Sequence, residues 1–135
     1  MIIQFNTRAP VYLQVVDYFK KKMALGELKA GEEMPSRREL ATELKINPNT
    51  VQKAFKEMED QQLITTERNR PSRVTTDDHV LKQIRAELVD EAVAVFVESI
   101  QELDVTMDEL VGKIKRQYGE GNLDDRSTGS KEALS

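Results

Sequence analysis

Two helix-start signals, eleven residues apart, constrain the fold of this chain more than any other feature of its sequence. Ser36 is followed three residues later by Glu39, which is the spacing of a capping box. Asn47 precedes Pro48, so a preferred N-cap residue stands directly before a residue that is over-represented at the first helical position. These signals predict two helices, over about residues 36–44 and 48–62, joined by a tight turn.

The second of these predicted helices has one apolar and one polar face. Its buried stripe, at helical spacing, consists of Val51, Ala54, Phe55 and Met58. The opposite face carries Asn49, Gln52, Lys53 and Lys56, which must point away from the core. A short helix, a tight turn and a helix with an available polar face are typical of a helix-turn-helix unit, whose second helix enters the DNA major groove.

Other elements are predicted on both sides of this unit. An apolar pattern at i, i+3, i+4 and i+7 predicts a helix from Pro10 to near Gly26. Two Thr-rich segments, 63–66 and 73–76, predict a β-hairpin whose longer tip is basic. Two further helices are predicted, one over about residues 79–103 and one opened by a capping box of Thr106 with Glu109.

The first of these later helices is apolar around most of its circumference near residues 92–97. One neighbouring helix cannot cover that much apolar surface, so a second subunit is the expected cover. The residues predicted to form this dimer surface are Leu88, Ala92, Val95, Phe96, Ile100, Leu110 and Ile114.

We therefore expect a mainly α fold with a small β-hairpin. A winged helix-turn-helix domain is predicted over residues 1–76, and a C-terminal two-helix dimerisation hairpin over 77–118. Residues 119–135 are rich in Gly, Asp, Ser and Asn with few apolar residues, which predicts a disordered tail.

Composition excludes several kinds of function. The 135 residues include no Cys and one His, so disulfides, thiolate zinc sites and ordinary transition-metal sites are not expected. We find no phosphate-binding glycine loop or nucleophile motif, so we expect neither an enzyme nor a cofactor. The longest apolar run, Val93–Val97, is too short to span a membrane, and we expect a cytoplasmic protein.

The charge distribution favours a nucleic-acid partner for the front half only. The net charge is −4, but residues 1–75 hold 13 Lys/Arg against 10 Asp/Glu, whereas residues 76–135 hold 7 against 14. A basic front half and an acidic back half indicate two different tasks.

Several motifs in residues 10–75 agree in order with one family. The chain contains P-x-Y-x-Q at 10–14, G-x-x-x-x-G at 26–31, P-S-x-R-x-L-A at 35–41 and T-V-x-x-A at 50–54. Together these motifs resemble the winged helix of GntR-type bacterial regulators. The version N-P-N-T-V-Q-K-A-F, with a short helical C-terminal segment, is similar to the YtrA-like short subfamily.

The resemblance implies a homodimer that binds double-stranded DNA at a palindromic operator, more specifically a repressor, and relatives of this kind often control transporter operons. Arg38 falls on the family's DNA-contacting arginine, and Asn49 and Thr50 fall on its recognition-helix contacts. Gln and Asn side chains suit adenine edges, whereas Thr suits phosphate or a thymine methyl. With the basic hairpin tip, the predicted DNA-binding set is Ser36, Arg37, Arg38, Asn47, Asn49, Thr50, Gln52, Lys53, Arg68 and Arg70.

Alternatives stay open at several of these positions. Arg38 could instead pair with Glu39 or Glu43, and Thr50 could only support the start of its helix. Pro48 stands where many relatives carry Arg, so a preference for guanine is not expected. The wing has no Gly-x-Gly tip, and Arg68, Arg70 and Arg73 could be a solvated basic loop rather than a phosphate contact.

Two broader questions also stay open. Winged helices serve as protein-binding modules as well, so the runner-up function is an interaction module without specific DNA binding. A small-molecule effector would find room only at the dimer interface or at a domain junction, because a helical hairpin has little interior space.

Overall fold

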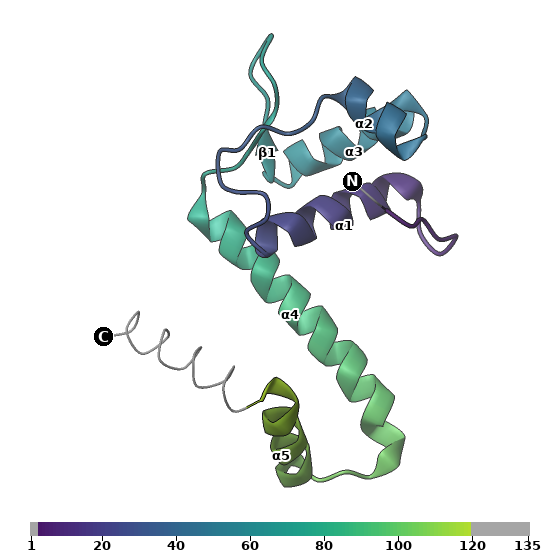
Figure 1. Cartoon of the computed structure of the whole chain (residues 1–135), viewed down its shortest axis with the longest axis vertical. Helices are drawn as coiled ribbons and strands as arrows, with labels where there is room; N and C mark the ends of the chain where they lie inside the picture. Colours follow the sequence, from purple (N-terminus) through teal and green to yellow (C-terminus); the bar gives the residue numbers. More distant parts are fainter. Residues whose placement is uncertain (1–2, 120–135) are drawn as a thin grey trace. The chain divides into compact units, whose positions relative to one another are not determined.

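The computed structural model describes residues 3–119, which divide into two compact units, one up to Ala92 and one from Val93. Most of the chain is helical, with one small antiparallel sheet (Figure 1). The elements in chain order are α1 (Val11–Ala24), α2 (Arg37–Leu44), α3 (Pro48–Asp60), β1 (Ile64–Thr65), β2 (Arg73–Val74), α4 (Asp78–Ile100), the 3-10 turn η1 (Gln101–Leu103) and α5 (Met107–Tyr118).

Helices α1 and α3 lie side by side and run in the same direction in the first unit (Figure 1). Near their N-terminal ends, Lys53 of α3 lies over the ring of Tyr12 of α1. Near their C-terminal ends, Lys20 and Gln61 line the same groove. The start of α1 is therefore at the same end of the unit as the start of α3.

The core forms where the predicted apolar stripes meet. The predicted stripe of α3 is fully buried, and it packs with α1 and α2 in one cluster. The buried apolar residues of the three helices are Val15, Val16, Phe19, Met23, Leu40, Ala41, Val51, Ala54, Phe55 and Met58. Burial of this set fixes which face of α3 stays outside.

Both helix-start signals act as the sequence predicts. Ser36 Oγ accepts a hydrogen bond from Glu39 N at 3.0 Å, and the Glu39 side chain accepts from Ser36 N, which completes the capping box. Asn47 Oδ1 accepts from Asn49 N at 2.7 Å at the start of α3. Between the two helices, Lys45 adopts a left-handed conformation with φ 55°, which reverses the chain within a short turn.

The helix predicted to reach residue 62 ends earlier. Helix α3 stops at Asp60, and Gln62 takes a positive φ of 64°. Leu63 N then donates to Met58 O at 2.9 Å, so the last turn is closed and the chain turns into β1.

The hairpin is shorter than predicted and gains a third chain segment. Strands β1 and β2 pair in register Ile64↔Val74 and Thr65↔Arg73. Residues 31–34 run along the other side of β2, because Val74 N donates to Glu32 O and Met34 N donates to Ser72 O. The extended conformation that Pro35 imposes on Met34 therefore brings this segment to the sheet.

The first part of α4 belongs to the first unit. Asp77 Oδ1 accepts a hydrogen bond from His79 N at 2.9 Å, which caps the helix start. Ile84 is buried in the core cluster, and Leu81 and Leu88 pack against it. Lys20 of α1 pairs with Glu87 of α4 at 3.6 Å. The sequence predicts a separate dimerisation hairpin from residue 77. In the structure, the first compact unit continues to Ala92 and so includes the start of this segment.

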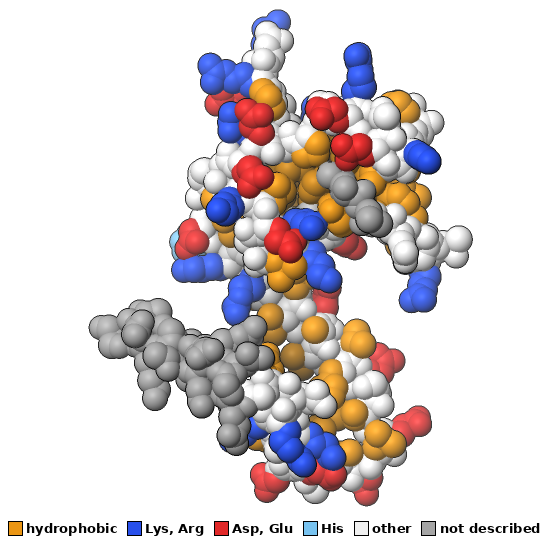
Figure 2. All heavy atoms as spheres, in the orientation of Figure 1, with side chains coloured by type: hydrophobic (Ala, Val, Ile, Leu, Met, Phe, Trp, Pro, Cys, Tyr) orange, Lys and Arg blue, Asp and Glu red, His pale blue; other side chains and the backbone are white. Residues whose placement is uncertain are grey.

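The second unit contains the end of α4, η1 and α5. Asp104, with φ 52°, follows η1, and Thr106 Oγ1 then accepts from Glu109 N at 3.2 Å to start α5. Hydrophobic side chains lie on the surface of this helical segment (Figure 2). The predicted disordered tail lies outside the described residues, apart from Gly119.

No helix between residues 3 and 119 combines the length and the apolar character needed to cross a membrane.

Candidate nucleic-acid interface

The polar face of α3 is the centre of the candidate interface. Asn49 and Gln52 are exposed on the side opposite the buried stripe, and Thr50 is half-buried. Asn47 is exposed, and its side-chain oxygen is used in capping α3. The first two turns of α3 therefore present amide and hydroxyl groups to an outside partner, as base reading in a major groove requires.

Lys53 is the cation nearest these amides in sequence, and its position is set by α1. Its Nζ lies 4.4 Å from the centroid of the Tyr12 ring. A cation over an aromatic face is attracted by the negative charge density of that face. The contact restrains a side chain that would otherwise sample many rotamers.

The two neighbouring arginines of α2 have different environments. Arg37 lies with its guanidinium 4.5 Å from the Phe55 ring centroid, and its Nη2 is 3.9 Å from Glu59 Oε1. Its Nε is buried without a hydrogen-bond partner among the residues that the structure describes. Arg37 therefore joins α2 to α3, and only part of its side chain is accessible.

Arg38 is exposed, and within residues 3–119 it forms no ion pair. The alternative of a pair with Glu39 or Glu43 is not realised in this structure. Arg38 is thus the arginine of α2 whose whole guanidinium is available to a phosphate.

The wing presents two arginines and uses a third for its own attachment. Arg68 and Arg70 are exposed near the tip, and Arg70 pairs weakly with Glu67 at 3.6 Å. Asn69 occupies the tip with φ 61°, a conformation that Asn tolerates better than most residues. The wing therefore turns without the usual glycine.

Arg73 has a structural role that the sequence did not indicate. Its Nη2 lies 2.9 Å from Glu33 Oε1, and its Nη1 donates to Gly31 O at 3.0 Å. These contacts join β2 to the segment before α2. Arg73 consequently fixes the base of the wing, although its side chain is still 50% exposed, and Arg68 and Arg70 are the basic residues near the tip.

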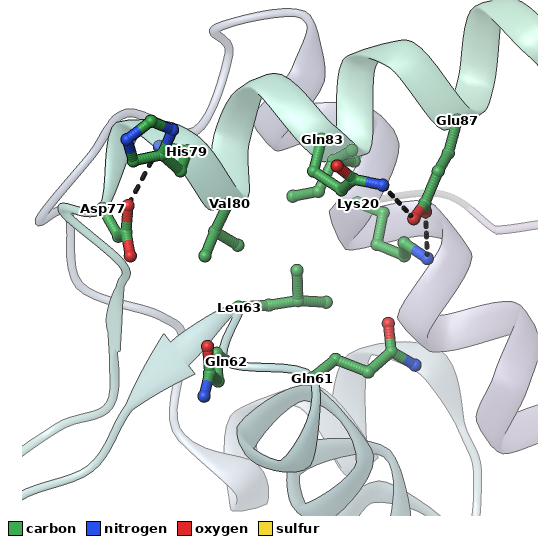
Figure 3. Close-up of a pocket in the computed structure, with 10 residues that line it drawn as sticks. Lys20, Gln61, Gln62, Leu63, Asp77, His79, Val80, Gln83 and Glu87 are labelled. Carbon is green, nitrogen blue, oxygen red and sulfur yellow. Dashed lines mark hydrogen bonds and ion pairs between the residues drawn. The ribbon is translucent and has the colours of Figure 1, made fainter.

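A groove lies at the other end of the first unit, where α4 begins (Figure 3). It has a volume of about 380 Å³, and its lining includes Gln61, Gln62, His79 and Gln83. The Lys20–Glu87 pair closes one side. All of its lining residues belong to the first unit, and the expected effector site at a dimer interface or domain junction stays a prediction.

No group of three or more potential ligands among residues 3–119 could hold a metal ion. The hydrogen bond with Glu27, at 3.0 Å, raises the pKa of Lys22. This pair lies at the C-terminal end of α1, far along the chain from Asn49 and Gln52.

The predicted dimer residues fall into three groups. Ala92, Val95, Phe96 and Ile114 are exposed, with Val95 at 68% and Phe96 at 39%. Ile100 and Leu110 are half-buried. Leu88 packs against the core of the first unit, so the structure does not place it with the others.

Three helices around one core, a tight turn before α3 and a small sheet with a basic tip define a winged helix-turn-helix domain. Residues 11–74 match the model of the family described as bacterial regulatory proteins, gntR family. The chain belongs to the GntR family.

Two relatives from Bacillus subtilis match most of the chain. The uncharacterised HTH-type transcriptional regulator YhcF is 32% identical over 112 residues, which cover 83% of this chain and 93% of YhcF. The HTH-type transcriptional repressor YtrA is 34% identical over 104 residues, which cover 76% of this chain and 75% of YtrA. The predicted resemblance to GntR regulators and to YtrA is confirmed.

A solved structure has a similar fold over nearly its whole length. A GntR family transcriptional regulator from Listeria monocytogenes superposes with a TM-score of 0.74 at 28% identity, covering 83% of this chain and 98% of that one. The predicted fold class, mainly helical with a winged helix-turn-helix, is therefore confirmed.

Proposed function

We propose that this protein is a dimeric, sequence-specific DNA-binding repressor that occupies a palindromic operator. The observation that carries the proposal is the exposed amide face at the start of α3, with the unpaired Arg38 and the basic wing tip as its accessible cations. The names of the relatives, a transcriptional repressor and a transcriptional regulator, support the same function.

In this proposal the groups divide into readers and positioning contacts. Asn49 and Gln52 read base edges in the major groove, since a carboxamide matches the paired donor and acceptor of adenine. Arg38, Arg68 and Arg70 bind phosphates and fix the register of the domain on the duplex. Ser36, Arg37 and Asn47 act mainly by holding α2 and α3 in place. Thr50 contacts a phosphate or a thymine methyl, and Lys53 adds a positive charge beside the readers.

The proposed dimer uses the apolar surface of the second unit. Seven large apolar or aromatic side chains of the end of α4 and of α5 are at least 40% exposed, and Phe96 is 39% exposed; the seven are Val93, Val95, Val97, Met107, Val111, Ile114 and Tyr118. Removing apolar surface from water is worth about 25 cal/mol per Å², so this segment gains from a covering partner. A two-fold symmetric copy is the simplest cover, and its symmetry matches a palindromic operator.

The target genes are a further part of the proposal. A dimer on an operator represses by blocking access to the promoter, and the repressor YtrA is among the relatives. The similarity to short GntR regulators makes a transporter operon the proposed target. A small-molecule effector would act at the dimer interface or at a domain junction.

The decisive experiment is selection of genomic fragments by the purified full chain, followed by binding titrations on the selected site and on random DNA. Gln52→Ala should weaken binding to the selected site by about 1 to 3 kcal/mol and leave random-DNA binding nearly unchanged. Gln83→Ala is the matched control and should change neither affinity. Gln83 is an exposed glutamine of α4, and it lines the groove with Gln61 and Gln62, at the opposite end of α3 from Gln52. Equal losses on both DNAs would show that Gln52 is not a reader.

The alternative, an interaction module without specific DNA binding, makes the opposite prediction. Such a protein would select no fragment and would show no steep dependence of DNA affinity on salt. Either result would refute the proposed function.

A further inference from the structure

The short segment before α1, residues 6–9, is held in a defined position by one side chain of that helix. Gln14 Nε2 donates to Asn6 O at 2.9 Å and to Ala9 O at 2.7 Å, and Gln14 Oε1 accepts from Asn6 N at 3.0 Å. Asn6 Oδ1 in turn accepts from Arg8 N at 2.9 Å. Four hydrogen bonds between this backbone turn and two amide side chains therefore give the turn a defined conformation.

This turn lies at the end of the first unit where α3 begins. Because α1 and α3 are parallel, with Tyr12 beside Lys53 and Lys20 sharing a groove with Gln61, the residues that precede α1 lie near the start of α3. Figure 1 shows the loop before α1 projecting beyond that helix at this same end.

Arg8 is the charged residue of the turn. It is exposed, and among the described residues its guanidinium has no acidic partner. The residues from 3 to 9 contain no Asp or Glu, so no local carboxylate competes for it. An unpaired guanidinium on a backbone turn of defined conformation suits a phosphate, to which it can donate two parallel hydrogen bonds.

We propose that residues 6–9 form a DNA-contacting arm, in which Arg8 binds a backbone phosphate beside the bases read by α3 and Gln14 is the positioning residue that holds the arm. The inference rests on the proposed DNA-binding function and adds a contact outside the helix-turn-helix and the wing. It also gives Gln14, the last residue of the P-x-Y-x-Q motif, a physical role in binding.

The test is the salt dependence of DNA binding by the full chain with Arg8→Ala. Each phosphate contact adds about 0.9 to the slope of log affinity against log salt, so the slope should flatten by about 0.9 for one engaged Arg8 and about 1.8 for both copies in a dimer. Between 50 and 200 mM salt this changes the affinity ratio of wild type to variant by about 3- to 12-fold. Arg85→Ala, at an exposed position of α4, removes the same charge and should leave the slope unchanged.

A double-mutant cycle tests the role of Gln14. Gln14→Ala should flatten the slope in the wild-type background and change nothing when Arg8 is already Ala, because Gln14 acts through the arm. A loss of affinity of the same size in both backgrounds would overturn the positioning role. Thermal unfolding of each variant identifies any that fails to fold, and the Arg8→Ala comparison does not depend on Gln14.

The outcomes separate the arm from the proposed function. Wild-type protein with a steep salt slope, together with an Arg8→Ala slope equal to that of Arg85→Ala, would refute the arm and leave the DNA-binding function intact. An effect of Arg8→Ala confined to one flanking sequence, with an unchanged slope, would also refute the phosphate contact. Wild-type protein that binds no DNA would overturn the function and the arm together.

Discussion

Substitutions at Asn47 can separate the stability of α3 from the contact that α3 makes with DNA. Its Oδ1 accepts a hydrogen bond from Asn49 N at 2.7 Å, which satisfies one of the N–H groups left open at the start of α3. Asn47→Ala removes this acceptor and should lower the free energy of unfolding by about 1 kcal/mol. For a domain of this size, a loss of that magnitude lowers Tm by about 4 to 8 °C.

Two companion substitutions distinguish a cap from a DNA contact. Asn47→Ser keeps a capping oxygen, so its Tm should stay near that of the wild type. Asn47→Asp keeps the cap and adds a negative charge that favours the helix start, so stability should be kept or slightly raised. The same charge faces the DNA, however, and should weaken binding to both selected and random duplexes.

The assay combines differential scanning calorimetry with fluorescence anisotropy on labelled duplexes, at one pH and one salt concentration. The expected pattern is a loss of stability in Asn47→Ala alone and a loss of DNA affinity that is greatest in Asn47→Asp. An unchanged Tm in Asn47→Ala, combined with a tenfold or larger loss of operator affinity, would refute the reasoning. Asn47 would then act as a reader and not as a cap.

Three further predictions concern the dimer, the wing and the core. Phe96→Glu should give a monomer by sedimentation at micromolar concentration, since it removes the apolar contact of a side chain that is 39% exposed in one chain and places two unpaired carboxylates in the interface, at a cost of several kcal/mol; Gln117→Glu, at an exposed polar position of α5, is the charge-matched control, and a dimeric Phe96→Glu protein would exclude this surface. Replacing both Arg68 and Arg70 by Ala should flatten the salt slope by about 0.9 for each phosphate that these arginines bind in the wild type, and an unaltered slope would remove the wing from the interface. Phe55→Ala, which truncates a ring that is 1% exposed, should lower the free energy of unfolding by about 3 to 5 kcal/mol in urea titrations, and a decrease below about 1 kcal/mol would contradict the tight packing of α3.

Local signals explain why so much of the first unit could be predicted. The Ser36–Glu39 box and the Asn47–Pro48 pair act through hydrogen bonds between near neighbours in sequence, and both form as expected. The buried stripe of α3 follows from helical spacing alone, and Val51, for example, is fully buried. The family motifs then assign the class of protein, because they occur in the right order along one domain.

Long-range contacts account for what the sequence did not indicate. The sequence pattern grouped Arg73 with the basic wing, but its partners, Gly31 and Glu33, lie about forty residues earlier in the chain. Leu88 was one of the predicted dimer residues, and it packs against the core of the first unit. Helical periodicity shows which side of a helix is apolar. It does not show whether the chain's own core or a second subunit covers that side.

The sequence by itself determined the order of the elements, the helix starts and the face of α3 that carries Asn49 and Gln52, because caps and periodicity are local properties of the chain. Only the tertiary structure decided which cations are available to a partner. Arg37 and Arg38 are neighbours in sequence and chemically identical, but packing on Phe55 and Glu59 engages the first and leaves the second unpaired among the described residues. The availability of a charge depends on its neighbours in space, and those neighbours are fixed when the helices pack.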